Sequence, residues 1–202
     1  NIPQDVDQVK DIAAANAAFA AGKTNVIVTD VPTEDATLIL PSTEAPVSAT
    51  LPALTKGLKV QYSDIADAKQ PASFHLTASS SATVEIDAAA STVTLAGTNY
   101  SDVTATTAAN TLIVSEETTI DKLTVKSGNV EVYGTVKAIA SKPAATTVTL
   151  HTSTAAKLQE FAAGVKAGTN LYNKVVLDAD IDFKGAAFQI EDARNIEFDG
   201  QG

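Results

Sequence analysis

An acidic group near the end of the chain offers the side chains best suited to chemistry. Its members are Asp178, Asp180, Asp182, Glu191, Asp192 and Asp199. Alternate residues of a strand share one face, so Asp178, Asp180 and Asp182 are expected to point the same way. Oxygen ligands in that arrangement could hold Ca²⁺, and carboxylates about 5–10 Å apart could cleave a glycosidic bond. We favour the simpler interpretation, an outward face that serves solubility, and leave calcium binding open.

The remaining reactive residue types form no recognisable catalytic or metal-binding motif. His75 and His151 each alternate within an apolar segment, so each is expected to face solvent or a corner. Neither has a neighbouring His, and the chain has no Cys, so no metal site is predicted. There is no Gly-x-Ser-x-Gly elbow and no Gly-rich phosphate loop. We therefore assign no catalytic, metal or cofactor-binding residue, expect no cofactor, and lean against an enzyme.

Short apolar–polar–apolar triplets indicate the strands that would position the polar side chains of this protein. They are Val84-Glu85-Ile86, Val93-Thr94-Leu95, Leu123-Thr124-Val125, Val130-Glu131-Val132 and Val148-Thr149-Leu150. A period of two buries one face of each short strand and leaves the other in water. Many short strands joined by brief turns indicate a mainly β protein, either a β-solenoid or a β-sandwich.

Two amphipathic helices interrupt the strands. Apolar spacing predicts one helix over Asp5–Ala21, with a stop at Gly22, and a second from about Ser153 to Lys166, with a stop at Gly168. Between Pro41 and Pro71 the pattern loosens, which indicates loops or edge strands. After the second helix, strands are predicted over residues 174–183, 188–190 and 196–198.

The two helices share a short internal repeat. The segment Phe19-Ala20-Ala21-Gly22 recurs as Phe161-Ala162-Ala163-Gly164, and each copy is followed by Thr-Asn and then a β-branched strand. This suggests two copies of one starting unit. We therefore expect a helix-capped β-solenoid region over residues 1–150. Residues 151–202 form a second helix–strand unit, either continuous with that solenoid or the start of another.

One stretch has the composition of a complete solenoid turn. Residues 123–136 contain three short strands separated by a Gly-Asn corner and a Gly-Thr corner. Small residues let the backbone turn while apolar side chains fill a narrow interior. The open end of such a stack needs a cover, and the first helix is placed to provide it.

The whole chain resembles right-handed parallel β-helix proteins of the pectate-lyase-like superfamily, especially exported surface proteins of Bacteroidetes-type bacteria. The matching features are the 123–136 turn, the helix-then-strand units, residues 174–183, and the tail at 195–202. The resemblance implies a mainly β fold: a right-handed parallel β-helix with an N-terminal capping helix and a second internal helix. It transfers no catalytic residue, because the acidic, basic and His arrangements of catalytic members are not visible here. The alternative fold is a set of β-sandwich modules, which the two internal helices disfavour.

Composition and net charge limit the classes of partner that this chain is expected to bind. The formal net charge is −10 and the isoelectric point about 4.5, so phosphate backbones and anionic lipid heads would be repelled. No apolar run approaches the roughly 20 residues that cross a bilayer. The absence of Cys and an initiator Met, with abundant Ala, Thr and Ser, fits a secreted or cell-surface bacterial protein, with or without a lipid anchor before processing. We expect no nucleic-acid partner and no direct membrane insertion, and oligomeric state stays open.

These observations favour a non-catalytic exported β-solenoid module for cell-surface display, adhesion or glycan binding. Its partner would be a polysaccharide or a surface protein. One alternative is a polysaccharide lyase or glycoside hydrolase, or its N-terminal part, and another is a structural spacer in a surface assembly. Outward threonines such as Thr94, Thr124 and Thr149 could form a ladder that contacts a repeating polymer, although β-propensity alone also explains them.

Overall fold

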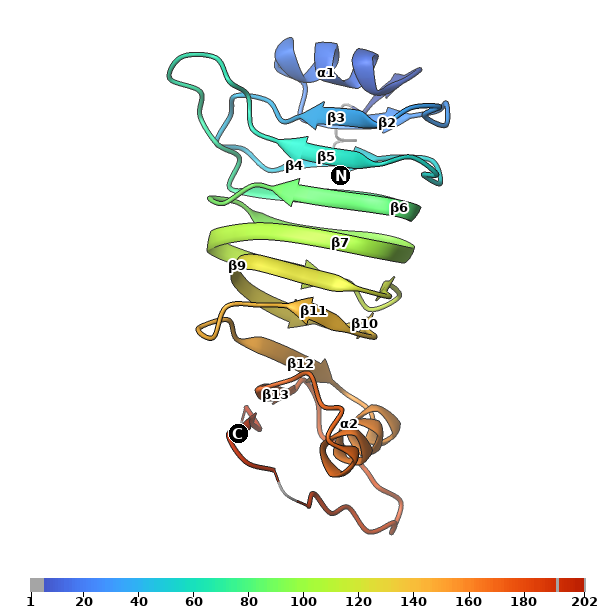
Figure 1. The fold of residues 1–202 in the computed structure, drawn as a ribbon, viewed down its shortest axis with the longest axis vertical. Coiled ribbons are helices and arrows are strands. Elements are labelled where there is room, and N and C mark those ends of the chain that lie inside the picture. The colour runs from blue at the N-terminus through green and yellow to red at the C-terminus, as the bar shows by residue number, and fades with distance from the viewer. Residues whose placement is uncertain (1–5, 192, 202) are drawn as a thin grey trace.

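The strands of this protein stack across its long axis in one parallel sheet (Figure 1). The computed structural model describes residues 6–191 and 193–201. The elements are β1 (Asp7–Val9), α1 (Ile12–Ala20), β2 (Asn25–Val28), β3 (Ala36–Ile39), β4 (Val47–Thr50), β5 (Leu58–Gln61), β6 (Ser73–Asp87), β7 (Thr92–Val114), β8 (Thr119–Ile120), β9 (Leu123–Val132), β10 (Thr135–Val136), β11 (Ile139–Ser141), β12 (Val148–Thr152), α2 (Ala155–Ala167), β13 (Lys174–Leu177) and β14 (Glu197–Asp199).

The pairings fall into three ladders. The first ladder runs through β1, β2, β4, β6, β7, β9, β12, β13 and β14. The second joins β3 and β5 to the last part of β6, the middle of β7 and the first part of β9, and ends at β11. The third links a bridge at Leu54 through β6 and β7 to β8 and β10. Long strands such as β7 take part in all three ladders, because the chain bends from one to the next.

Each ladder buries a column of side chains that are in register. In the first ladder the column includes Val26, Ala49, Leu76 and Leu95, and later Val132, Leu150 and Val175. The second contains Leu38, Val60, Ile86, Ala105 and Val125, and the third Leu54, Ser80, Tyr100, Ile120 and Val136. Burial of these stacked apolar side chains is the main source of stability.

The predicted strand alternation is confirmed for the triplets at 84–86, 93–95, 123–125 and 130–132, whereas Thr149 in the triplet at 148–150 is buried. In β6, Val84 and Ile86 are fully buried, whereas Glu85 between them points outward and lies 3.8 Å from Lys126. Every strand pairing among the described residues is parallel. Immunoglobulin-like sandwiches are built from antiparallel sheets, so this pairing differs from the alternative fold.

Glycines form the bends between ladders. Gly97 in β7 has φ +105°, and a Cβ there would lie 1.8 Å from the Ala78 carbonyl oxygen of the preceding turn. Gly128 in β9 has φ +91°, and a Cβ would lie 2.2 Å from the Thr107 oxygen. The sequence pattern predicts a corner at Gly128. Both glycines are bends inside continuous strands, where only glycine allows both the backbone angle and the close approach.

The first helix is shorter than its sequence pattern predicts. A start at Asp5 lies outside the described residues, but Asp7–Val9 form β1, paired with β2, and α1 begins only at Ile12. Asp11 is the N-cap, because its Oδ1 accepts the Ala14 N–H at 2.8 Å. The ladder bonds to β2 and this cap together set the helix start after Asp11.

The first helix covers the free edge of β3. Asn16 on α1 donates through Nδ2 to the Thr37 carbonyl at 2.9 Å, and its Oδ1 accepts the Ile39 N–H at 2.8 Å. One carboxamide thus satisfies a donor and an acceptor that a neighbouring strand would otherwise occupy. Ile12, Phe19 and Ala15 on the same helix are buried in the main core. The helix therefore covers this end of the stacked strands.

The loose segment between Pro41 and Pro71 contributes interior strands. β4 pairs with both β2 and β6, and β5 pairs with both β3 and β6. The expectation of loops or edge strands is wrong for these two elements. Their prolines lie outside the strands, so no ladder bond is lost.

The second helix matches its prediction closely. Thr154 caps α2 by accepting the Lys157 N–H, and Gly168 ends it in the left-handed conformation. The helix lies between β12 and β13, which are parallel partners, as α1 lies between β1 and β2. The internal repeat in the sequence therefore corresponds to a strand–helix–strand unit that occurs twice.

The end of the chain is less regular than predicted. The strand expected over residues 174–183 stops at Leu177, and residues 188–190 are not a strand. β14, at Glu197–Asp199, is close to its predicted place. A second, smaller core forms here around Leu150, Leu158, Phe161 and Val175. Neither helix of the described part is long and apolar enough to span a membrane.

Candidate functional site

The acidic group of the sequence does not share one strand face. Because β13 ends at Leu177, Asp180 and Asp182 lie in the irregular segment that follows it. The Asp182 Oδ1 accepts the Lys184 N–H at 2.7 Å, which is a local turn contact that competes with strand formation. The predicted alignment of Asp178, Asp180 and Asp182 is therefore wrong.

The other acidic residues of this group are also separate. Glu191 lies 3.3 Å from the Lys166 ammonium, and Asp199 lies 3.7 Å from that of Lys174. Lys174 also lies 3.0 Å from Glu197, and these carboxylates raise the pKa of its ammonium. Asp192 lies outside the described residues. No group of three or more His, Asp or Glu side chains in the described ranges is arranged to hold a metal ion.

The two histidines have different surroundings. His75 on β6 is exposed, as predicted. His151 on β12 is only 10% exposed, because three neighbours enclose its ring. Its Nδ1 lies 3.0 Å from Asp178 Oδ1, its Nε2 is hydrogen-bonded to Glu131 Oε2, and the Tyr133 ring stacks on it at 4.0 Å between centroids. His151 was expected to face solvent or a corner. It points outward between buried Leu150 and Thr152, but its three enclosing neighbours cover most of its ring.

The first ladder brings this His151 cluster together. Glu131 is on β9, His151 on the adjacent β12, and Asp178 directly follows β13, the next strand. A carboxylate occupies each ring nitrogen, so neither nitrogen is open to a ligand. The cluster can hold the Tyr133 ring in place, but it offers no free proton acceptor on the histidine. Burial raises the pKa of the Tyr133 hydroxyl, and the Asp178 and Glu131 carboxylates raise it further.

A hollow of about 650 Å³ lies beside this cluster, and we call it the Tyr133 groove. Tyr133 is 39% exposed and is one of the residues that line the groove. Glu116, Glu160 and Asp178 contribute carboxylates to the lining, and Lys157 contributes the one ammonium among the described lining residues. The groove therefore carries an excess of negative charge.

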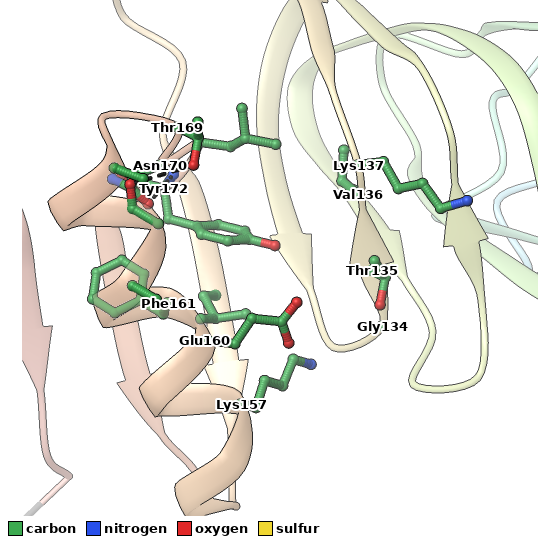
Figure 2. A pocket seen from close by; sticks show the side chains of 15 residues that line it. Gly134, Thr135, Val136, Lys137, Lys157, Glu160, Phe161, Thr169, Asn170 and Tyr172 are labelled. Carbon is green, nitrogen blue, oxygen red and sulfur yellow. Dashed lines mark hydrogen bonds between the residues drawn. The ribbon is translucent and has the colours of Figure 1, made fainter. Parts of the chain in front are cut away.

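A second hollow, of about 540 Å³, separates α2 from β10, and we call it the α2 cavity. Its lining includes Val136 on β10 and the apolar residues Leu150, Phe161 and Leu171. Figure 2 shows Lys157 and Glu160 extending from α2 towards β10, with the Tyr172 hydroxyl pointing into the space between them. Gly134, Thr135, Lys157 and Glu160 line both hollows, so the α2 cavity and the Tyr133 groove adjoin.

Burial alters the ionisation of two lining residues. It raises the pKa of the Tyr172 hydroxyl to about 12, with a further contribution from the Glu160 carboxylate, so this hydroxyl stays protonated near neutral pH. Burial lowers the pKa of the Lys157 ammonium, and the charges of Glu116 and Glu160 oppose that change. The Lys157 ammonium also donates to the Tyr133 carbonyl oxygen. The neutral Tyr172 hydroxyl and the Lys157 ammonium thus provide hydrogen-bonding groups in the α2 cavity, and Lys157 also lines the Tyr133 groove.

Sequence reasoning missed these lining residues. Tyr133 lies in the predicted 123–136 turn, and Lys157 and Glu160 lie in the predicted second helix, where the sequence pattern indicates no binding role. The strand register could have revealed this part of the site. The number of residues in one coil of the chain places Glu131 on β9 and His151 on β12, which are adjacent strands. The proposed threonine ladder also fails, because Thr149 is buried and Thr124 pairs in a different ladder from Thr94.

The lining of the two hollows thus combines the Tyr133 ring with charged, polar and apolar side chains. Comparison of the chain with protein-family models, with characterised proteins and with solved structures finds no match.

Proposed function

We propose that this chain is a right-handed parallel β-helix module that binds a polysaccharide at the bacterial cell surface without cleaving it. The β-helix interpretation is supported by the three parallel ladders and their in-register buried columns. A right-handed path is supported by the strong preference of parallel crossover connections for that hand. Export and surface display rest on the acidic, Cys-free composition.

The observation that carries the binding proposal is the Tyr133 groove. A partly exposed aromatic ring, held flat by stacking on His151, gives a rigid apolar face of the kind that sugar rings stack on. Hydrogen-bonding groups surround it, including the Glu160 and Lys157 side chains. A concave site with an apolar face and a few polar groups is suited to a small polar ligand.

The negative charge of the Tyr133 groove indicates which class of sugar it would bind. Glu116, Glu160 and Asp178 exceed the single Lys157 in the described lining. Uronic acids would meet net repulsion in such a site, whereas neutral sugars would not. The proposed ligand is therefore a neutral glycan, and pectic polymers are disfavoured.

A non-catalytic role has its own support. Both His151 nitrogens contact carboxylates, which leaves no free base on the ring. Asp180 lies in an irregular segment, and Asp199 contacts Lys174, so these two carboxylates are not assembled as a pair facing one site. Most glycoside hydrolases use two carboxyl groups that flank the cleaved bond, and Asp180 and Asp199 do not provide such a pair.

A glycan array followed by titration calorimetry tests the binding proposal. Tyr133→Ala is expected to weaken binding of the best neutral glycan at least about tenfold, because the stacking face is lost. Tyr133→Phe keeps that face and should bind within about threefold of the wild type. Val31→Ala, an exposed apolar position at the other end of the chain, serves as the matched control. A protein that binds no glycan, or whose binding ignores Tyr133→Ala, is not the proposed module.

Turnover assays separate binding from cleavage. We expect no reducing-sugar or unsaturated product from any glycan that binds. Turnover that is abolished by Asp180→Asn or Asp199→Asn would instead establish the enzymatic alternative. Labelling of intact cells with an antibody against the chain tests surface display, and absence of surface signal would contradict it.

The elongated arrangement of strands also favours a second role, a spacer within a surface assembly. A spacer would hold its neighbours at a fixed distance and would need no ligand in the groove. Pull-down from the native envelope distinguishes this role, since a spacer is recovered with fixed protein partners and a free binder is not.

A further inference from the structure

The two hydrogen bonds of the His151 ring together require an extra proton. Its Nδ1 lies 3.0 Å from Asp178 Oδ1, and its Nε2 is hydrogen-bonded to Glu131 Oε2. An ionised carboxylate only accepts hydrogen bonds, and a neutral imidazole has a single N–H to donate. Both contacts are therefore hydrogen bonds only if one further proton is present, on the ring or on a carboxyl group. Because the three groups interact directly, this proton belongs to the cluster as a whole.

The two carboxylates of the cluster have no second ion-pair partner in the part of the chain that the structure describes. Glu131 and Asp178 each pair with His151, and their side chains are only 34% and 33% exposed. Lys157 lines the adjoining groove, but its ammonium donates to the Tyr133 carbonyl oxygen. Loss of the extra proton would leave two partly buried carboxylates beside a ring that can donate to only one of them.

The other titratable groups near the cluster come from three elements. Glu116 lies between β7 and β8, and Lys157 and Glu160 are on α2. Burial raises the pKa of the Tyr133 hydroxyl, so this group keeps its proton at neutral pH. Histidine is the side chain that ordinarily changes charge between pH 5 and pH 8. A change of charge in that interval is therefore expected at the His151 cluster.

The cluster ties three successive strands together where the stack becomes thinner. Glu131 is on β9, His151 is on β12, and Asp178 directly follows β13. Beyond β12, the described strands β13 and β14 continue the first ladder alone. The Asp178 N–H donates to the Thr152 carbonyl at 3.0 Å, and an irregular segment follows. A contact at Asp178 therefore holds the point at which the regular strand ends.

We propose that the extra proton lies on His151 and that the His151 cluster is a pH-sensitive clasp for the Tyr133 ring and the end of β13. The clasp is closed while the ring is an imidazolium. When the proton leaves at higher pH, one hydrogen bond is lost and the two carboxylates repel each other. The Tyr133 ring, stacked at 4.0 Å, also loses its attraction to a cationic partner. The clasp thus stabilises this region at low pH, and its contribution is lost as the pH rises.

Nuclear magnetic resonance of protein with isotope-labelled histidine tests the clasp directly. The His151 ring should carry two N–H groups at pH 5.5 and a single one at pH 9. The Tyr133 ring signals should shift in step with that change, and His75→Gln, at the exposed histidine, should leave the shift unaltered. A His151 ring with one N–H at pH 5.5 or two at pH 9, or Tyr133 signals that ignore its titration, overturns the proposal.

Hydrogen exchange measures what the clasp holds in place. The Asp178 N–H should lose at least about tenfold in protection between pH 6 and pH 9, after correction for the intrinsic exchange rate, because a bond to a charged group is lost. The Leu51 N–H, which bonds the Thr77 carbonyl in the main stack, should keep its protection. Equal losses at the two amides, or none at Asp178, would contradict a local clasp.

Two substitutions that remove the same charge locate the effect. Asp178→Asn should remove most of the pH dependence of the Tyr133 signals, because an amide can donate to a neutral ring nitrogen and no extra proton is needed. Asp180→Asn, in the irregular segment two residues later, should respond to pH as the wild type does. The same response in both variants would indicate a general charge effect and would overturn the clasp.

Control of the Tyr133 groove by the clasp rests on the proposed polysaccharide-binding function. The best neutral glycan should bind at least about threefold more tightly at pH 6 than at pH 9, and Asp178→Asn should remove that difference. A clasp that titrates in a protein that binds no glycan overturns the proposed function alone. Glycan binding without a titrating clasp overturns the clasp alone. Binding that ignores a titrating clasp overturns its control of the groove.

Discussion

The helices α1 and α2 occupy equivalent places in the chain but meet the ladders differently. Each connects two parallel partner strands and begins at a side-chain cap, Asp11 or Thr154. At α1, Asn16 bonds the β3 edge and Phe19 enters the main core. At α2, no described hydrogen bond reaches β10, and a cavity of about 540 Å³ lies between them. The same unit thus closes one end of the stack and leaves a binding-sized space at the other.

This difference separates two uses of an amphipathic helix. A helix that must exclude water from a sheet edge needs both apolar contact and a polar group that pairs with the edge. A helix that lacks the polar group leaves the edge available to a ligand. The comparison therefore predicts unequal responses to equivalent substitutions.

The largest effect is expected from truncating the helix phenylalanines. Phe19→Ala removes a side chain that is 1% exposed in the main core and should lower the free energy of unfolding by about 3–5 kcal/mol. Phe161→Ala lies beside the α2 cavity, where neighbours have room to relax, and should cost less. Urea denaturation of both variants measures the difference, and equal losses would contradict it.

The next effect tests the edge contact of α1. Asn16→Ala leaves the Thr37 carbonyl and the Ile39 N–H without their partner and should cost about 2–3 kcal/mol. Asn16→Asp keeps an acceptor for Ile39 but removes the donor to Thr37, so its loss should be partial at a pH where its carboxylate is ionised. Gln159→Ala, on an exposed position of α2, is the control and should change stability by less than about 0.5 kcal/mol. A similar loss for the control would show that Asn16 has no special role.

Substitutions of the glycines at the C-terminal ends of the two helices should have similar effects on stability. Gly22 and Gly168 have φ of +91° and +71°, and neither would bring a new Cβ within 4 Å of other atoms. Replacing either with Ala should cost about 1 kcal/mol from backbone strain alone. Thermal unfolding of the two variants checks this, and a much larger loss at one end would reveal a contact missing from the comparison.

The smallest effect concerns alkaline pH at the α2 end. The pKa of the Tyr172 hydroxyl is about 12 in the folded protein, compared with 10.0 as its ordinary value. Above pH 10 the unfolded chain loses this proton first, so the stability contribution is intact below pH 10 and is lost as the pH rises towards 12. Between pH 9 and pH 10.5, Tyr172 should account for a loss of about 1 kcal/mol or less. Tyr172→Phe should flatten that part of the stability profile, and an unchanged profile would contradict the assignment.

Much of the secondary structure can be predicted from local sequence patterns. Alternation such as Val84-Glu85-Ile86 identified strands, and the Thr154 and Gly168 signals placed the ends of α2. The pattern failed at Asp7–Val9, where pairing with β2 overrides a helical spacing, and at Asp182, where a side-chain turn ends the predicted strand. In both cases a contact made elsewhere or a local cap decides between two acceptable local conformations.

The candidate site was harder to foresee than the strands. Glu131, His151 and Asp178 meet because three successive strands of one ladder are in register, and register depends on the length of each turn. The spacing of residues along one strand carries no such information, so it does not reveal that carboxylates from the adjacent strands cover the outward-facing His151 ring. The α2 cavity also depends on the separation between α2 and β10. That separation is set by tertiary packing and not by local sequence.

The direction of the ladders has a mechanical consequence. Strands lie across the long axis of the molecule, so the bonds between neighbouring turns point along it (Figure 1). Tension applied between the two ends would open those bonds a few at a time, instead of shearing a whole strand. Peeling should begin beyond β12, where β13 and β14 continue a single ladder, and stop at the better-connected turns around β7. Pulled in this geometry, the protein would extend in a series of small steps at low force.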